Sequence, residues 1–518
     1  MIDEKLITTN RRVNSYTSSS SWRRFVGPIV IIAAITALSV IHGYNVFHNP
    51  APTDEEGTYA AQAWALLHLD KLAPYTYWYD HPPFGWMTMA LLRLITGSLW
   101  LPAPDYIASF RELFVGFFAM SAIGVVLIGR RLQFSWIAVF GSLLLFGLSP
   151  LAINLQRLVE LDNIAVLYMI FALYFALDPQ RHLRSSVLSG LFLAFSVLSV
   201  ETMLLYAPVV IYLLLRGWPK STRSVAMSMF LVTWISTGLL YIVYAASKNE
   251  LLPVPPHASA PHVSLLGSAY WQLVQRPPSG HIYVTGTVAN QLLQEWVHFD
   301  PIILVLMVAG AILGWFSRKV WPFALALTIA SLMLLRDGYL PITYPVEVMP
   351  FLAITGGGLI SAVLSFAKAK HRVWHSLFSV LISLSMLVLG GWWFHQDQKL
   401  VFPSVDQPQL AAEHWVTAHL NRSLPIMVDD SMWVDFVHAG WQPNKVVWFY
   451  KINTDTQVEA RYPLGWRQIG YVVVTPTMRA EVKLIPFLPK MEAQSKLLAS
   501  FGLGGGAVDV YQVNGVVG

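Results

Sequence analysis

Long apolar runs recur along this chain from Val26 to Phe394 and limit its fold more than any other feature. Hydrophobic residues make up 55% of the 518 residues, and charged residues only 12%. A helix needs about 20 consecutive apolar residues to cross the roughly 30 Å hydrocarbon core of a bilayer. The pattern therefore predicts a multi-spanning α-helical membrane protein.

Eleven of these runs are candidate transmembrane helices. They cover residues 26–46, 110–129, 134–152, 163–178, 187–200, 202–216, 224–246, 299–317, 320–335, 342–366 and 374–394. One further run, 84–97, has 14 residues and carries Arg93 at its centre. Because it is short and charged, we expect it to lie along the membrane surface as an interfacial helix.

Basic residues predict the orientation of the spans. Before residue 399, the N-terminal tail and the turns on its side hold 17 Lys and Arg residues, against seven on the other side. The positive-inside rule then places the N-terminus in the cytoplasm and the segment after residue 398 outside. Carboxylates show the reverse distribution, since between residues 25 and 398 only Asp178 falls on the basic side. An acidic outer face indicates a site that faces away from the cytoplasm.

Composition excludes several classes of function. The net charge of +5 is explained by cytoplasmic turns that face anionic lipid, so we expect membrane lipid and no nucleic acid as a partner. The chain has no cysteine, which excludes disulfides and thiolate metal sites. It also lacks the His-Glu-x-x-His, Gly-x-Ser-x-Gly and Walker motifs. We expect localisation in the plasma membrane as a multi-pass protein.

The chain divides into a transmembrane domain, residues 1–398, and a soluble extracytoplasmic α/β domain, residues 399–518. In the second domain, apolar alternation predicts strands within 425–428, 445–452, 469–475 and 507–513, and helices over 409–420 and 478–501. Two long outer loops, 47–109 and 247–298, interrupt the first domain, and the later loop carries a short helix around 289–297.

Three consecutive carboxylates, Asp54, Glu55 and Glu56, follow the first span. Carboxylates this close raise one another's pKa, so one of them can act as a general base near neutral pH. The alternative is a structural role, in which Thr53 or Asp54 caps a helix whose first turn is acidic. The two interpretations are compatible.

A second group of charged residues lies at the outer start of a later span. Arg157 can receive a phosphate while Glu160 and Asp162 orient a sugar, although a surface salt bridge is the simpler account. Asp80 and His81 stand before the interfacial helix, where His81 can contact phosphate or be an ordinary loop residue.

Two further candidates lie at the outer ends of spans. Glu201 forms the tip of a short hairpin of two spans, where an ionisable group is costly unless it meets a wet cavity or a partner. Arg336 lies at the outer end of a span and is followed by Tyr344. An Arg336–Asp337 pair is also compatible with a purely structural role.

Taken together, these motifs resemble the GT-C superfamily of lipid-phosphate-dependent glycosyltransferases. The segments Asp54-Glu55-Glu56-Gly57-Thr58-Tyr59, Asp80-His81-Pro82-Pro83 and Arg157…Asp162 are most similar to the family-39 group of protein O-mannosyltransferases and bacterial aminoarabinose transferases. The terminal soluble domain resembles actinobacterial-type members in particular. One departure is that His81 stands where the family has a lysine that contacts phosphate.

This resemblance implies an inverting enzyme that moves a sugar, a hexose or a pentose, from a polyprenyl-phosphate donor to a hydroxyl on a glycan, lipid or protein. No cofactor is required, and a divalent metal is not indicated. The resemblance implies catalytic roles for Asp54, Glu55 and Asp162, with Asp54 preferred as the base and Glu55 close behind. The implied substrate-binding residues are Glu56, Tyr59, Asp80, His81, Arg157, Glu160, Glu201, Arg336 and Tyr344.

The competing hypothesis is a transporter or flippase for a lipid-linked sugar. It accounts for the spans and for Glu201. It also predicts charge in the middle of the membrane in both halves and an internal repeat, and the sequence shows neither.

Overall fold

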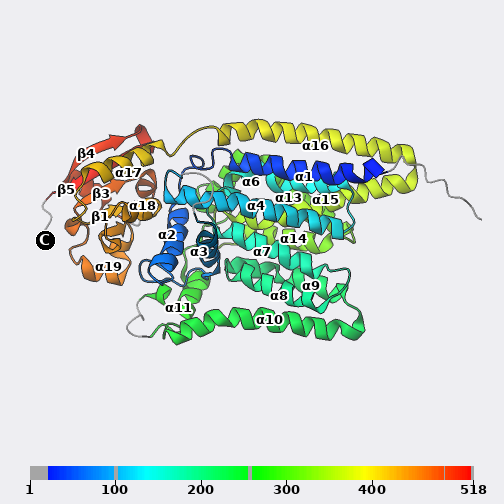
Figure 1. Cartoon of the computed structure of the whole chain (residues 1–518), viewed down its shortest axis with the longest axis horizontal. Coiled ribbons are helices and arrows are strands. Elements are labelled where there is room, and N and C mark those ends of the chain that lie inside the picture. Colours follow the sequence, from blue (N-terminus) through cyan, green and yellow to red (C-terminus); the bar gives the residue numbers. More distant parts are fainter. Residues whose placement is uncertain (1–20, 98–102, 255–259, 483–484, 515–518) are drawn as a thin grey trace, which may run out of the picture.

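A computed structural model describes residues 21–97, 103–254, 260–482 and 485–514. Helices form a long bundle, and a small mixed sheet lies at one end of it (Figure 1). In the described part of the chain, five helices are long and apolar enough to cross a membrane. They are α1 (Ser21–Gly43), α4 (Tyr106–Arg131), α10 (Lys220–Ser247), α15 (Tyr344–Lys370) and α16 (Arg372–Val401).

Two bent helix pairs raise this number to seven spans within the described ranges, if each pair crosses once. The pair α5 (Trp136–Gly147) and α6 (Pro150–Gln156) bends by 59°, and the pair formed by α12 (Val288–Phe299) and the helical segment 301–316 bends by 106°. Proline at the first turn of each second helix explains the breaks. The expected number of eleven spans stays a prediction.

Shorter helices complete the bundle. They are α7 (Leu161–Ala176), α8 (Leu183–Val197), α9 (Ala207–Gly217), α13 (Pro301–Leu313) and α14 (Trp321–Leu335), with the 3-10 helices η1 (Glu201–Tyr206) and η4 (Gly314–Phe316). Helices α5 and α15 pack closely because Gly357 has no side chain, and a Cβ there would lie 2.0 Å from the Ser142 hydroxyl.

Two helices of the loop between α1 and α4 lie between the bundle and the sheet (Figure 1). Helix α2 (Asp54–His68) starts with a capping box in which the Thr53 and Glu56 side chains satisfy each other's backbone amides. Thr53 was one of the two caps expected from the sequence. Helix α3 (Phe84–Thr96) leaves Leu91, Leu94 and Ile95 exposed, and its position along the membrane surface stays a prediction.

The C-terminal sheet has strand order β2-β1-β3-β5-β4. Strands β1 (Ile426–Val428), β2 (Val446–Trp448) and β3 (Tyr471–Val474) are parallel, whereas β4 (Ser495–Phe501) and β5 (Val508–Val513) are antiparallel neighbours. Helices α17 (Gln407–His419), α18 (Trp433–His438) and α19 (Thr456–Arg461) pack around them. The four strands expected from the sequence are present.

The helix expected over 478–501 is wrong. That stretch holds the short helices α20 (Pro476–Ala480) and α21 (Leu488–Ala493), and its last seven residues form β4. Ser495–Phe501 contains good helix formers, but hydrogen bonding to β5 outweighs their local preference. The proposed division of the chain at residue 399 stays a prediction.

Candidate active site

A cavity of about 890 Å³ lies where the long loops before α3 and α12 meet the ends of the bundle helices. Its wall comes from α2, the α2–α3 loop, the start of α7, η1, α10 and the segments before α12 and α15. Most of the site residues expected from the sequence line it, namely Glu55, Tyr59, Asp80, His81, Glu160, Asp162, Glu201, Arg336 and Tyr344. Asp54, Glu56 and Arg157 are not among the lining residues.

Glu55 lies in the first turn of α2 and borders the cavity. Its side chain is exposed to the cavity, yet protein atoms surround it on the other sides. This burial raises the pKa of Glu55 well above its ordinary value of 4.5, and the neighbouring Asp54 carboxylate adds to the effect. Such a carboxylate can accept a proton near neutral pH.

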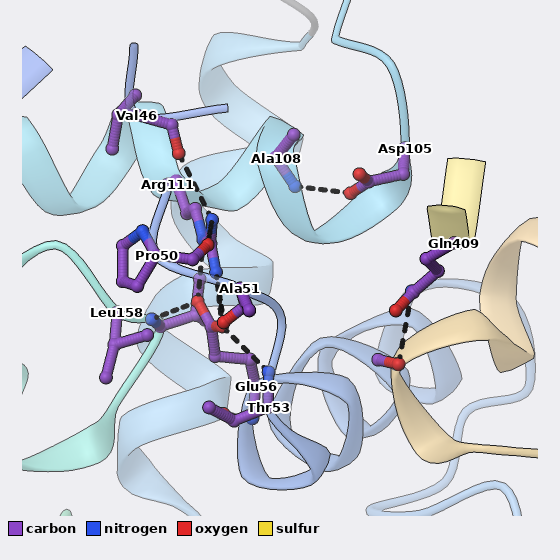
Figure 2. Close-up of polar contacts among 12 residues, drawn as sticks. Val46, Pro50, Ala51, Thr53, Glu56, Asp105, Ala108, Arg111, Leu158 and Gln409 are labelled. Atoms are coloured by element: carbon purple, nitrogen blue, oxygen red, sulfur yellow. Dashed lines mark hydrogen bonds and ion pairs between the residues drawn. The ribbon is translucent and has the colours of Figure 1, made fainter. Parts of the chain in front are cut away.

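Glu56 does not line the cavity, and Figure 2 shows its carboxylate directed toward Arg111. It is fully buried and receives hydrogen bonds from the Arg111 guanidinium at 2.5 and 2.8 Å and from the Val159 amide at 2.8 Å. Arg111 also donates to the Pro50 carbonyl at 2.7 Å. These contacts join α2, α4 and the α6–α7 turn, so Glu56 anchors the fold.

Arg157 is also buried, with 1% of its surface exposed. Its Nη2 donates to the Tyr44 carbonyl at 2.7 Å, which ties the end of α6 to the chain after α1. The phosphate role expected for Arg157 therefore has no geometric support. The sequence places Arg157 near Asp162, but the turn before α7 directs the two side chains differently.

Two arginines do line the cavity, and a tyrosine holds both. The guanidinium of Arg276 lies 3.1 Å from the centre of the Tyr339 ring, and Nη2 of Arg336 donates to the Tyr339 carbonyl at 3.2 Å. Arg276 was missed as a site residue, because nothing in its own loop indicates contact with the α14–α15 loop.

His81 forms an ion pair with Glu201 across the cavity, with 3.1 Å between Nδ1 and a carboxylate oxygen. Burial alone would lower the pKa of His81, but the Glu201 carboxylate outweighs this and raises it. The Tyr77 hydroxyl donates to the His81 carbonyl at 2.9 Å and fixes the backbone of the loop. The imidazole is thus favoured as a cation.

The remaining acidic residues have distinct surroundings. Glu160 directly precedes α7 without a side-chain capping hydrogen bond, and burial together with the nearby Glu55 raises its pKa. Asp80 accepts hydrogen bonds from His262 at 2.7 Å and from Ser268 at 2.8 Å, so it links the α2–α3 loop to the segment between α10 and α12. Among the described residues, no group of three or more His, Asp or Glu side chains is arranged to hold a metal ion.

Apolar side chains also line the cavity. They include Leu198, Leu205, Ile242, Leu273 and Met333, and Leu273 has 85% of its surface exposed. We call these side chains the apolar wall. A lining that contains both charged and apolar side chains suits a ligand with a polar head and a hydrocarbon chain.

No protein-family model and no curated protein matches the chain. Solved structures do. ArnT from Cupriavidus metallidurans bound to undecaprenyl phosphate matches with a TM-score of 0.54 and 13% identity, over 95% of this chain and 99% of that chain. Oligosaccharyltransferase AglB from Archaeoglobus fulgidus, in complex with an inhibitory peptide and a dolichol-phosphate, matches with a TM-score of 0.55 and 12% identity. The match covers 95% of this chain and 74% of that chain.

These neighbours are GT-C glycosyltransferases. At such low identity, the likeness is evidence about the fold alone. The resemblance drawn from the sequence motifs is therefore confirmed at that level. This chain therefore shares the overall fold of ArnT and AglB, and its candidate site lies where the long loops before α3 and α12 meet the ends of the bundle helices.

Proposed function

We propose that the chain is a membrane glycosyltransferase that moves a sugar from a polyprenyl-phosphate donor to an acceptor hydroxyl. One observation carries this proposal. A single cavity joins a carboxylate of raised pKa, Glu55, to two arginines and an apolar wall. These are the three elements that deprotonation, phosphate binding and lipid binding require.

The donor phosphate lies against Arg276 and Arg336 in this proposal, with His81 nearby in place of the lysine of the resembling family. The cations stabilise the negative charge that develops on the phosphate as it leaves. The polyprenyl chain follows the apolar wall formed by residues such as Leu205 and Ile242. Tyr339 keeps the two arginines in place before the donor arrives.

Glu55 acts as the general base in this scheme. It removes the proton from the acceptor hydroxyl while the hydroxyl oxygen forms a bond to the anomeric carbon. The bond from that carbon to the phosphate oxygen breaks, so the products are an inverted glycoside and polyprenyl phosphate. Glu160 and Asp162 accept hydrogen bonds from sugar hydroxyls. Glu55 replaces Asp54 as the preferred base because only Glu55 lines the cavity.

The finer assignments follow from the sequence. We propose a family-39-like enzyme of actinobacterial type in the plasma membrane. Its N-terminus lies in the cytoplasm, and residues 399–518 lie outside. The sugar is a hexose or a pentose, and the acceptor is a glycan, a lipid or a protein.

The test uses purified protein in nanodiscs with polyprenyl-phosphate hexoses and pentoses that carry a labelled sugar, and a cell-envelope extract as acceptor. We expect release of polyprenyl phosphate together with labelled acceptor. Glu55→Gln should lower the rate by about 10²–10⁴, as loss of a general base does. Asp54→Asn is the matched control and should lose far less. Full activity in Glu55→Gln would contradict the assignment. Movement of donor across the membrane without release would support the transporter hypothesis.

A further inference from the structure

The C-terminal segment packs directly on the first turn of α2, the turn that carries Glu55. Gly57 lies against the 3-10 helix η5 (Asp430–Met432), which follows β1. A Cβ at Gly57 would lie 2.3 Å from the carbonyl carbon of Asp430 and 2.3 Å from the Ser431 nitrogen. The two backbones therefore approach more closely than any residue with a side chain allows.

Hydrogen bonds fix this contact. The Thr58 hydroxyl donates to Oδ2 of Asp430 at 2.6 Å, and the Tyr450 hydroxyl donates to the same oxygen at 3.0 Å. Asp430 has only 1% of its surface exposed. Its neighbour Asp429 is held in turn by Thr475 at 2.6 Å, which joins η5 to the end of β3. Asp430 is thus mounted rigidly on the sheet.

The opposite side of the same turn is held by the bundle. Glu56 is fixed by Arg111 and by the Val159 amide. Glu55 precedes Glu56 by one residue and Thr58 by three, so its backbone is restrained from both sides. A carboxylate that must reach a hydroxyl in one geometry gains from such restraint, because small displacements of a catalytic group are costly.

The contact has only a small electrostatic consequence. Burial raises the pKa of Glu55 first, Asp54 raises it further, and Asp430 contributes least. Burial also raises the pKa of Asp430 itself well above its ordinary value, which favours its neutral form. The C-terminal segment therefore influences the position of this carboxylate more than its affinity for a proton.

We propose that Asp430 is a positioning residue for Glu55, and that residues of the C-terminal sheet belong to the catalytic machinery. This inference rests on the proposed function. Asp430 acts through the Thr58 hydroxyl and through the close contact of η5 with Gly57, and it touches no substrate.

Three variants test the inference. Asp430→Asn replaces one carboxylate oxygen by an amide group, and Thr58→Val removes one hydroxyl while keeping the branched side chain. Asp509→Asn is the matched control, because Asp509 on β5 pairs with Arg479 of α20 at 2.5 Å, away from α2. Two quantities are measured: hydrogen exchange of the amides in residues 54–58, and the pH dependence of sugar transfer.

We expect faster exchange in the first turn of α2 in Asp430→Asn and Thr58→Val, with α3 and the Asp509→Asn control unchanged. In both test variants kcat should fall, by up to about 10²-fold, while KM for the donor stays constant. The low-pH limb of the Asp430→Asn profile should stay close to that of the wild type, because Asp430 contributes least to the raised pKa of Glu55. Thr58→Val keeps the inference testable if Asp430→Asn fails to fold.

Unchanged exchange and unchanged kcat in both variants would overturn the inference. So would a loss of kcat that Asp509→Asn shares. Absence of transfer by the wild-type protein would instead overturn the proposed function, and the exchange measurement would still decide whether Asp430 holds the turn.

Discussion

Glu56 and Asp430 both hold the first turn of α2, but they belong to different regions of the molecule and use different physics. On the bundle side, a buried carboxylate meets a buried guanidinium. On the sheet side, neutral hydroxyls bind Asp430 and two backbones touch. Loss of one member of a buried ion pair leaves an uncompensated charge, whereas loss of a hydroxyl costs far less. The bundle side therefore determines whether α2 folds, and the sheet side determines its position.

The bundle side should show the largest effect. Arg111→Met keeps most of the side-chain volume but leaves Glu56 buried without its partner. We expect a loss of about 3–5 kcal/mol of stability. It is measured as a lower melting temperature, followed by tryptophan fluorescence in detergent. The double variant with Glu56→Gln removes the stranded charge and should recover part of the loss. Equal melting temperatures of the wild type and Arg111→Met would contradict the claim that the bundle side is the stronger anchor.

A change of volume on the sheet side should cost less stability than the loss of Arg111 on the bundle side. Gly57→Ala places a Cβ against the backbone of η5, which cannot move as a flexible side chain can. Overpacking of this kind costs about 1–3 kcal/mol, and it should displace Glu55 as well. The rate of sugar transfer should therefore fall by more than the small loss of stability alone explains. Ala61→Gly, in the next turn of the same helix, controls for changes in helix propensity. A Gly57→Ala variant with normal transfer would show that the close approach does not matter.

The phosphate end of the cavity should be independent of both anchors. Tyr339→Leu removes the ring under Arg276, a contact worth about 0.5–2 kcal/mol. We expect a higher KM for the donor with the low-pH limb of the rate profile unchanged. Trp466→Leu is the control, because it removes the ring under Arg467 at a place outside the cavity. A shifted pH profile in Tyr339→Leu would mean that the two ends of the cavity are coupled.

The smallest effect should be a change in pH dependence. A base must be deprotonated, so transfer falls as the pH drops through the raised pKa of Glu55. The low-pH limb of kcat/KM should lie above the ordinary glutamate value of 4.5. Asp54→Asn removes a neighbouring negative charge and should move the limb to lower pH. A limb that stays in place would mean that Asp54 does not influence the base.

The sequence predicted the long helices because hydropathy depends on the chain alone. It also predicted the acidic cluster and its cap, since capping is local to residues 53–56. It preferred Asp54 over Glu55 as the base, and it assigned Glu56 to substrate binding, whereas Glu56 is buried against Arg111. Which of two adjacent carboxylates meets Arg111 depends on how α2 packs against α4, which the local pattern does not specify.

Contacts between distant segments were the least predictable. His81 and Glu201 are 120 residues apart and were found as separate candidates, yet they form one ion pair. Arg276 was missed because its partner Tyr339 lies in another loop. Arg157 was assigned to phosphate from its place before a span, whereas its side chain reaches the Tyr44 carbonyl in the interior. Tertiary packing set each of these outcomes.

The most direct test of the account is an experimental structure of the protein with undecaprenyl phosphate in nanodiscs. We predict that the phosphate lies in the cavity against Arg276 and Arg336, on the same side as Glu55, with the hydrocarbon chain along Leu205 and Ile242. A phosphate bound elsewhere, such as beside the Arg130–Arg131 turn, would contradict the account.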